Sequence, residues 1–264
     1  MIPEALYTDW ISKNIADFFS ANGYRVRYSA VSQPVEAVFP FDRFYAFQGG
    51  DSPVCLFALQ FKSPKRKQND LLSFNIDLVQ LQKLQTKVFR DWVYYALPYF
   101  TLPDFQQSAL HLVNFIRPLQ IPRLEPRSYY NLHWRPPFMM LEFEKGNHPE
   151  PKELETHKIF DGFAPPGWAL SRRACTISDG TLRYEIPHVS WGELFNLLLT
   201  LQVGRHLLKR PDIEDFITQL KDVPIRVQNS ILIAIDLLKR TIELLVLLPD
   251  SGENSHLNNK VVLF

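Results

Sequence analysis

The chain has 264 residues, of which 46% are hydrophobic and 13% aromatic; this is enough apolar material for a substantial core and excludes wholesale disorder. The formal net charge of +1 neither indicates nor excludes a nucleic-acid partner, because such binding depends on local clusters of charge. The longest apolar stretch, residues 231–248, is interrupted by Asp236, Lys239, Arg240 and Glu243, so it does not predict a membrane span.

The N-terminus and the cysteines indicate a compartment. The first residues lack a basic segment followed by an apolar one, so the sequence predicts no secretory signal. Cys55 and Cys175 lie far apart, each in a strand-like context, and we interpret both as buried thiols. Together these features predict a protein of the reducing cytoplasm.

The first hundred residues predict an alternation of helices and strands. Helical spacing of apolar residues predicts a helix over 3–21, closed by Asn22 and Gly23. Strands are expected over 24–31, 35–47 and 54–62, with a turn at Gly49 and Gly50, followed by a helix over 70–87 and a strand over 92–99. The resulting α-β-β-β-α-β order predicts an α/β (α+β) fold, because a helix between two strands of one sheet favours a crossover and a mixed sheet.

The second half predicts a β-hairpin and a helical region. We expect residues 105–115 to be helical or extended, a strand over 138–144, and a loop over 146–167. Asp179-Gly180 predicts a hairpin turn between strands 174–178 and 181–186. Helices are expected over 190–208, 211–221 and 224–248, and a short strand over 260–264. Residues 1–120 would form a core and 121–264 an accessory region, or the whole chain one compact domain.

Polar residues at the end of the strand over 54–62 predict a functional site. That run is apolar until Gln60, Phe61 and Lys62, and on a strand Gln60 and Lys62 share one face. A buried strand should not end in an amide and an ammonium group unless something polar meets them. With Asp42 on the preceding strand, we expect a metal ion and a phosphate.

These residues and the order of elements resemble the PD-(D/E)XK nuclease superfamily, which has the restriction-endonuclease-like fold. Pro40-Phe41-Asp42 stands where the family has its metal-binding aspartate, and Gln60-Phe61-Lys62 matches the Gln-x-Lys motif of its Mrr-like branch. The resemblance covers about residues 1–100. It implies a nuclease dependent on Mg²⁺ or Mn²⁺, with DNA as the expected substrate, in restriction, phage defence or mobile-element processing.

The resemblance also implies a role for each residue. Asp42 would be the principal metal ligand, the Gln60 amide oxygen and the Phe61 carbonyl would be further ligands, and Lys62 would orient a water or neutralise the phosphate. The family often has a glutamate on the first helix, but here that position is Ser12. Glu36, six residues before Asp42, would add a carboxylate on the same face of a regular strand.

A short basic run and the final helices suggest partners. Lys65, Arg66 and Lys67 follow the motif and would attract a nucleic-acid backbone regardless of its sequence. The last predicted helix is apolar over a wide face, which suggests a homodimer or a partner subunit.

Several alternatives stay open. The fold could be a catalytically inactive, nuclease-like scaffold or nucleic-acid-binding subunit, or an unrelated α+β protein with a fortuitous motif. Asp42 could be a turn residue or pair with Arg43, and Gln60 and Lys62 could end an exposed edge strand. Glu36 and the basic run could simply be solvated, and the stretch from His148 to His157 is better explained as a solvated loop than as a zinc site.

Overall fold

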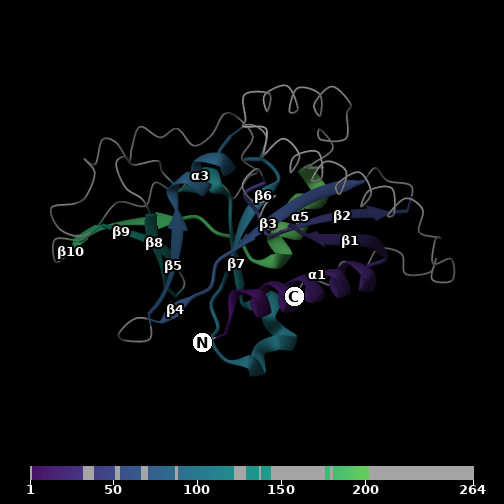
Figure 1. Ribbon diagram of the computed structural model, residues 1–264, viewed down its shortest axis with the longest axis horizontal. Coiled ribbons are helices and arrows are strands. Elements are labelled where there is room, and N and C mark those ends of the chain that lie inside the picture. The colour runs from purple at the N-terminus through teal and green to yellow at the C-terminus, as the bar shows by residue number, and fades with distance from the viewer. Residues whose placement is uncertain are drawn as a thin grey trace, which may run out of the picture.

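The computed structural model describes residues 2–31, 39–50, 54–66, 71–86, 89–121, 129–136, 138–143, 176–178 and 181–201. Two sheets organise these described residues (Figure 1). Sheet A has the order β1 (Tyr24–Ala30), β2 (Arg43–Gly49), β3 (Cys55–Phe61), β6 (Val93–Pro98), β7 (Val113–Ile116). Sheet B has the order β10 (Thr176–Ser178), β11 (Thr181–Ile186), β9 (Phe138–Phe143), β8 (Tyr129–Arg135), β5 (Leu72–Asp77), β4 (Lys65–Arg66). The helices are α1 (Glu4–Ala21), α3 (Leu78–Leu84) and α5 (Trp191–Leu201), with 3-10 helices η2 (Pro103–Leu112) and η3 (Pro118–Gln120).

Sheet A is mixed, as the sequence predicts. Strands β1, β2 and β3 form an antiparallel meander. The chain then passes through β4, β5 and α3 before β6 pairs parallel to β3, and β7 closes the sheet antiparallel to β6. The expected class, a mixed arrangement of helices and strands, is confirmed, and β3 lies in the centre of the sheet with all of its residues buried.

Helices α1 and α5 cover one face of sheet A with aromatic side chains. The ring of Phe19 on α1 lies 4.4 Å from that of Phe47 on β2, measured between centroids. Phe18 on α1 meets Phe195 on α5 at 4.9 Å, edge to face. Helix α1 ends at Ala21, and Gly23 two residues later has a φ of 77°, which a residue with a side chain rarely adopts. The C-terminal end of α1 is therefore fixed over sheet A.

The helix predicted over 70–87 is wrong in its first half. Residues 72–77 form strand β5 of sheet B, and only residues 78–84 form helix α3. Leu72, Phe74 and Ile76 alternate as buried strand residues, although the apolar spacing also suits a helix. Asp77 separates the two elements, because its carboxylate accepts the Gln80 N–H at 2.8 Å and caps α3.

The remaining predictions have mixed outcomes. The strand 138–144 and the hairpin are confirmed, with Ser178 opposite Thr181. The segment 105–115 is divided between η2 and β7, while β4 and β8 were not predicted. The strand predicted over 35–47 begins later than expected. Residues 39–42 are not part of a strand, and β2 begins at Arg43, just after Asp42.

Other predictions fall outside the described residues. These are residues 32–38 with Glu36, the loop 146–167 with His148 and His157, Cys175, the helices beyond 201 and the strand 260–264. Cys55 is buried as a thiol on β3. Sheet B takes strands from both sides of residue 121, and the proposed division there stays a prediction. Within the described ranges, none of the helices combines the length and apolarity needed to cross a bilayer.

Candidate functional site

Asp42 and Gln60 are in direct contact at one end of sheet A. Asp42 immediately precedes β2 and its main-chain N–H donates to the Leu59 carbonyl of β3 at 3.0 Å. One carboxylate oxygen of Asp42, Oδ2, accepts both the Phe61 main-chain N–H at 2.6 Å and the Gln60 amide N–H at 2.8 Å. The side chain of Asp42 thus takes the place of a main-chain acceptor at the end of the β2–β3 ladder, and it is rigidly placed.

The amide of Gln60 has its oxygen turned away from these partners. Its Nε2 also donates to the Phe61 carbonyl at 3.1 Å, and because both neighbours are acceptors the amide can face them only with its nitrogen. Its Oε1 is buried with no hydrogen-bond partner, and the residue is only 3% exposed. A buried acceptor without a partner costs about 1–3 kcal/mol, so this oxygen marks a place for a cation or a donor.

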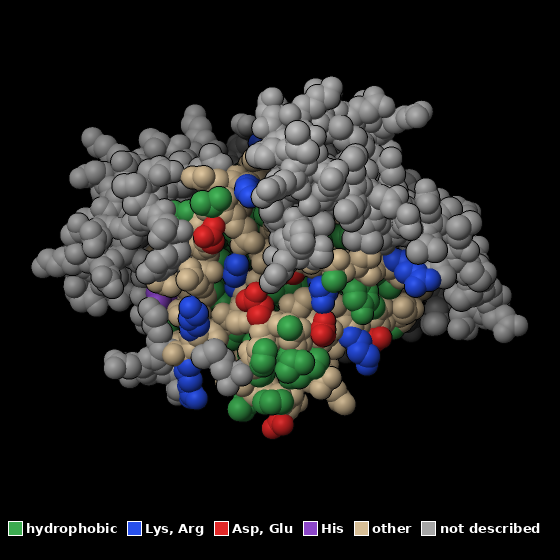
Figure 2. Space-filling model, in the orientation of Figure 1, with side chains coloured by type: hydrophobic (Ala, Val, Ile, Leu, Met, Phe, Trp, Pro, Cys, Tyr) green, Lys and Arg blue, Asp and Glu red, His purple; other side chains and the backbone are tan. Residues whose placement is uncertain are grey.

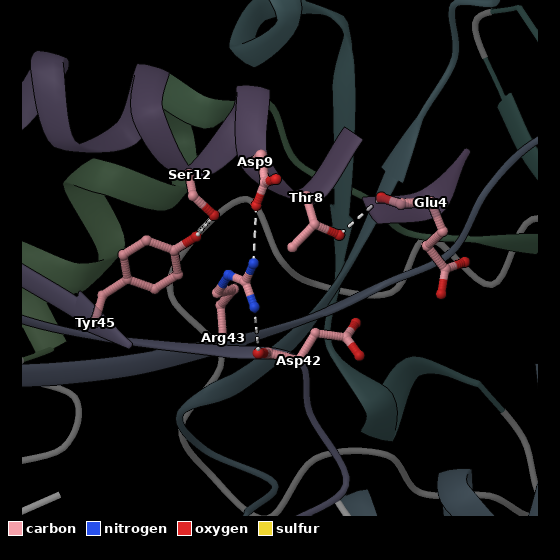
Figure 3. Close-up of polar contacts among 7 residues, drawn as sticks. All are labelled: Glu4, Thr8, Asp9, Ser12, Asp42, Arg43 and Tyr45. Carbon is pink, nitrogen blue, oxygen red and sulfur yellow. Dashed lines mark hydrogen bonds and ion pairs between the residues drawn. The ribbon is translucent and has the colours of Figure 1, made fainter. Parts of the chain in front are cut away.

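Arg43 fixes Asp42 from the side of α1. Its guanidinium forms an ion pair with Asp9 at 2.9 Å and donates to the Asp42 carbonyl at 3.3 Å (Figure 3). Arg43 therefore holds the main chain of Asp42, while the carboxylate points away from Arg43 (Figure 3) and accepts the Phe61 N–H at the end of β3. The carboxylate that forms the ion pair with Arg43 is therefore that of Asp9 and not that of Asp42.

Lys62 continues the line of β3. Its main-chain N–H donates to Ala96 of β6 at 3.2 Å, and the residue is half-buried. Strand alternation puts Lys62 on the face of Gln60. Because β3 lies between β2 and β6, the alternative in which Gln60 and Lys62 end an exposed edge strand is wrong.

The position expected to carry the helix-1 glutamate faces the core. Ser12 is fully buried, and its hydroxyl shares a hydrogen bond of 2.8 Å with the Tyr45 hydroxyl (Figure 3). A glutamate here would bury an ionised group among aromatic rings, at a cost that few sites can offset. The absence of an acid at Ser12 follows from this packing.

Glu4 is the acidic residue that α1 brings to the site. Its carboxylate oxygen Oε2 accepts the main-chain N–H of Ser63 at 2.8 Å. Phe61, whose N–H binds Asp42, lies two residues earlier, and amides two apart on a strand point to the same side about 7 Å from each other. Figure 3 shows Glu4 and Asp42 at the same end of sheet A. Sequence spacing failed to assign Glu4, since only the packing of α1 against β3 reveals it.

The basic residues lie a short distance along the chain from Lys62. Lys65 and Arg66 form β4 at the edge of sheet B, and both are exposed. On the face shown in Figure 2, acidic side chains near the middle of the described surface have basic side chains on either side of them. Lys67 and Glu36 lie outside the described residues.

The donor set suits a hard cation that keeps part of its water shell. Asp42, the Gln60 amide oxygen, the Phe61 carbonyl and Glu4 all offer oxygen, which Mg²⁺ and Mn²⁺ prefer over nitrogen or sulfur. In the described part of the chain, no three His, Cys, Asp or Glu side chains converge to hold a metal ion. These residues therefore do not surround a metal ion with protein ligands alone. Mg²⁺ does not need such a site, because it keeps several waters and binds through one or two carboxylates.

Comparison with known proteins identifies no relative of this chain. The sequence matches no family model, no curated protein and no solved structure at a significant level.

Proposed function

We propose that the chain is a divalent-metal-dependent nuclease that hydrolyses phosphodiester bonds, with DNA as the expected substrate. The observation that carries the proposal is the Asp42–Gln60 contact, which leaves the Gln60 Oε1 buried and without a partner at the end of a central strand. A carboxylate fixed by main-chain hydrogen bonds, beside an amide oxygen in need of a partner, is the arrangement expected of an oxygen-ligand cation site.

The topology of sheet A supports the same proposal. Helix α1, the meander of β1, β2 and β3, and the parallel return to β6 follow the α-β-β-β-α-β order of the superfamily that the sequence resembles. Strands β4 and β5 are added in the crossover. Fold alone does not fix an activity, which comes from the residues of the site.

Each residue has a separate task in this proposal. Asp42 and the Phe61 carbonyl would hold the cation, with Glu4 beside them. The Gln60 amide oxygen would join them once the amide turns, because in the metal-free structure its nitrogen faces both groups. A bound divalent cation would stabilise the charge that develops on the phosphate and lower the pKa of a bound water. Lys62 would pair with a phosphate oxygen, and Lys65 and Arg66 would bind the backbone beyond the scissile bond.

One observation favours a second candidate, a nuclease-like scaffold without catalysis. The residue in the acid-x-lysine position is the neutral Gln60, and the described residues include no cluster of three acidic or metal-binding side chains. A titration with Mn²⁺ separates the two candidates, because a scaffold would bind no cation at millimolar concentration.

The proposal is tested with purified full-length protein on supercoiled plasmid, linear duplex, single-stranded DNA and RNA. Each is incubated with Mg²⁺, with Mn²⁺ and with EDTA. We expect metal-dependent cleavage of at least one DNA substrate and none with EDTA. Absence of both cleavage and Mn²⁺ binding would leave the scaffold as the better account.

Replacing Lys62 by methionine should separate catalysis from metal binding. Removing a charge that meets the developing negative charge should lower the cleavage rate by roughly 10²–10³-fold. Mn²⁺ affinity should change little, because an ammonium group is not a ligand. The rate and the Mn²⁺ dissociation constant are measured on the same preparation.

The matched control is Lys65→Met on the exposed strand β4. It should weaken DNA binding and reduce the slope of log affinity against log salt by about 1 if that lysine contacts one phosphate. Equal losses of cleavage rate in the two variants would refute a special role for Lys62.

Replacing Glu4 by glutamine tests the acid that α1 contributes. The glutamine oxygen can still accept the Ser63 N–H, so the fold should persist while one negative charge is lost. We expect Mn²⁺ affinity to fall about tenfold, equivalent to about 1.4 kcal/mol. Asp17→Asn, which removes an exposed carboxylate from the same helix, is the control and should bind Mn²⁺ like the wild type.

A further inference from the structure

The strand next to Gln60 carries a second buried polar atom without a partner. Tyr95 on β6 is the register partner of Gln60 in the parallel β3–β6 ladder, so the two side chains lie on the same face about 5 Å apart at the backbone. The Tyr95 side chain is fully buried and its hydroxyl has no hydrogen-bond partner. A donor and an acceptor, both unsatisfied, therefore belong to paired residues on one face of sheet A, and one of the two residues contacts Asp42.

We propose that Tyr95 is a positioning residue of the site: its hydroxyl and the Gln60 amide oxygen together hold one water molecule beside Asp42. The water would accept the Tyr95 O–H and donate to Gln60 Oε1, which satisfies both groups at once. Its remaining lone pair stays available to the cation. This inference rests on the proposed nuclease function.

The electrostatic surroundings keep the hydroxyl in the form that can donate. Burial raises the pKa of Tyr95 far above its usual value, and the carboxylates of Asp77 and Asp42 raise this pKa further. Tyr95 therefore stays protonated at neutral pH. A protonated tyrosine can donate a hydrogen bond to a water bound to the cation. Mg²⁺ keeps several such waters, and groups of the protein form hydrogen bonds with them.

The neighbouring residue provides a matched control. Tyr94 is also buried on β6, but alternation turns it to the opposite face of sheet A. Burial raises its pKa, and Arg117 and Asp91 are the charges near it rather than Asp42. Tyr95→Phe and Tyr94→Phe each remove one hydroxyl from the same strand and leave the rings in place.

The test combines Mn²⁺ titration with ultraviolet difference spectroscopy on Mg²⁺ addition. Because Mg²⁺ absorbs no light, any difference band comes from aromatic side chains of the protein, and the two Tyr→Phe variants show whether Tyr95 gives the band. We expect the wild type and Tyr94→Phe to give a tyrosine difference band, and Tyr95→Phe to give none. The Mn²⁺ dissociation constant should rise about three- to tenfold in Tyr95→Phe only.

Each outcome decides the inference. If wild type binds Mn²⁺, Asp42→Asn does not, and Tyr95→Phe matches wild type in both measurements, the inference is overturned while the nuclease proposal survives. If wild type binds no Mn²⁺, both are overturned. Should Tyr95→Phe fail to fold, Gln60→Met removes the other half of the pair, and a Mg²⁺-induced band that persists in that variant overturns the inference.

Discussion

Replacing Asp42 by asparagine should abolish metal binding and lower the cleavage rate by roughly a thousandfold, while the fold is retained. Loss of the cation removes several kcal/mol of transition-state stabilisation, and each 1.36 kcal/mol corresponds to about a factor of ten in rate. A single oxygen, Oδ2, accepts both the Phe61 and the Gln60 hydrogen bonds. The oxygen of asparagine can take its place, so the variant tests charge and not structure.

Alanine at the same position should behave differently. Asp42→Ala leaves the Phe61 N–H and the Gln60 amide without their acceptor, which should destabilise the protein by about 1–3 kcal/mol for each group left unpaired. Comparison of the two variants by thermal unfolding therefore separates the structural role of Asp42 from its role in metal binding.

The control for Asp42→Asn is Asp9→Asn. Asp9 also lies near Arg43, but its side chain is 63% exposed and its ion pair should contribute no more than about 1 kcal/mol. This variant should cleave DNA and bind Mn²⁺ at close to wild-type levels. Undiminished cleavage by Asp42→Asn would assign the activity to a different site.

Replacing Gln60 by glutamate should strengthen metal binding and make stability dependent on the metal. The new carboxylate would lie within hydrogen-bond distance of Asp42 at a position that is 3% exposed. Two carboxylates so close cannot both ionise without a cation, so the pKa of one is raised. We expect Mn²⁺ affinity to increase about tenfold and metal-free stability to decrease by a few kcal/mol at neutral pH.

The sign of the pH dependence follows from that raised pKa. The folded protein holds a proton that the unfolded chain has lost above about pH 4.3, so metal-free stability decreases as pH rises through and beyond that value. Thermal unfolding at pH 5 and pH 8, with and without Mn²⁺, measures this. Mn²⁺ should restore the stability lost at pH 8.

Gln120→Glu is the matched control for this variant. Gln120 is also buried, at 1% exposure, and its amide oxygen accepts the Arg117 N–H at 2.8 Å. A glutamate there should likewise destabilise the protein, but Mn²⁺ should not restore its stability. If Mn²⁺ fails to stabilise Gln60→Glu as well, a cation site at this strand end is untenable.

The pattern of apolar residues along the sequence predicted those elements whose spacing fits either a strand or a helix but not both. The continuous apolar run that ends in Gln60 is the central strand β3, and the helical spacing of Ile11, Ile15 and Phe19 is the buried face of α1. The prediction over 70–87 failed because the segment carries two patterns at once. Leu71, Phe74 and Leu78 have helical spacing, whereas Leu72, Phe74 and Ile76 alternate as in a strand. Pairing with β8 selects the strand, and sequence periodicity does not contain that pairing.

The candidate site was predictable only in part for a related reason. Asp42 and Gln60 could be proposed from their positions at facing strand ends, and the structure brings them together. Glu4 and Tyr95 could not, because one depends on how α1 docks beside Ser63 and the other on the parallel register of β3 and β6. Both are tertiary features: Glu4 and Ser63 are 59 residues apart in the sequence, and Gln60 and Tyr95 pair only after the crossover from β3 to β6. Local pattern does not contain either contact.

Crystals of the wild-type protein soaked in Mn²⁺ give the most direct test, because manganese can be located by its anomalous scattering. We predict one strong peak at the end of β3, about 2.2 Å from the Asp42 carboxylate and from the Gln60 amide oxygen. A crystal that takes up Mn²⁺ elsewhere, or that shows the Gln60 oxygen satisfied by a protein donor and no peak beside it, would contradict the proposed site.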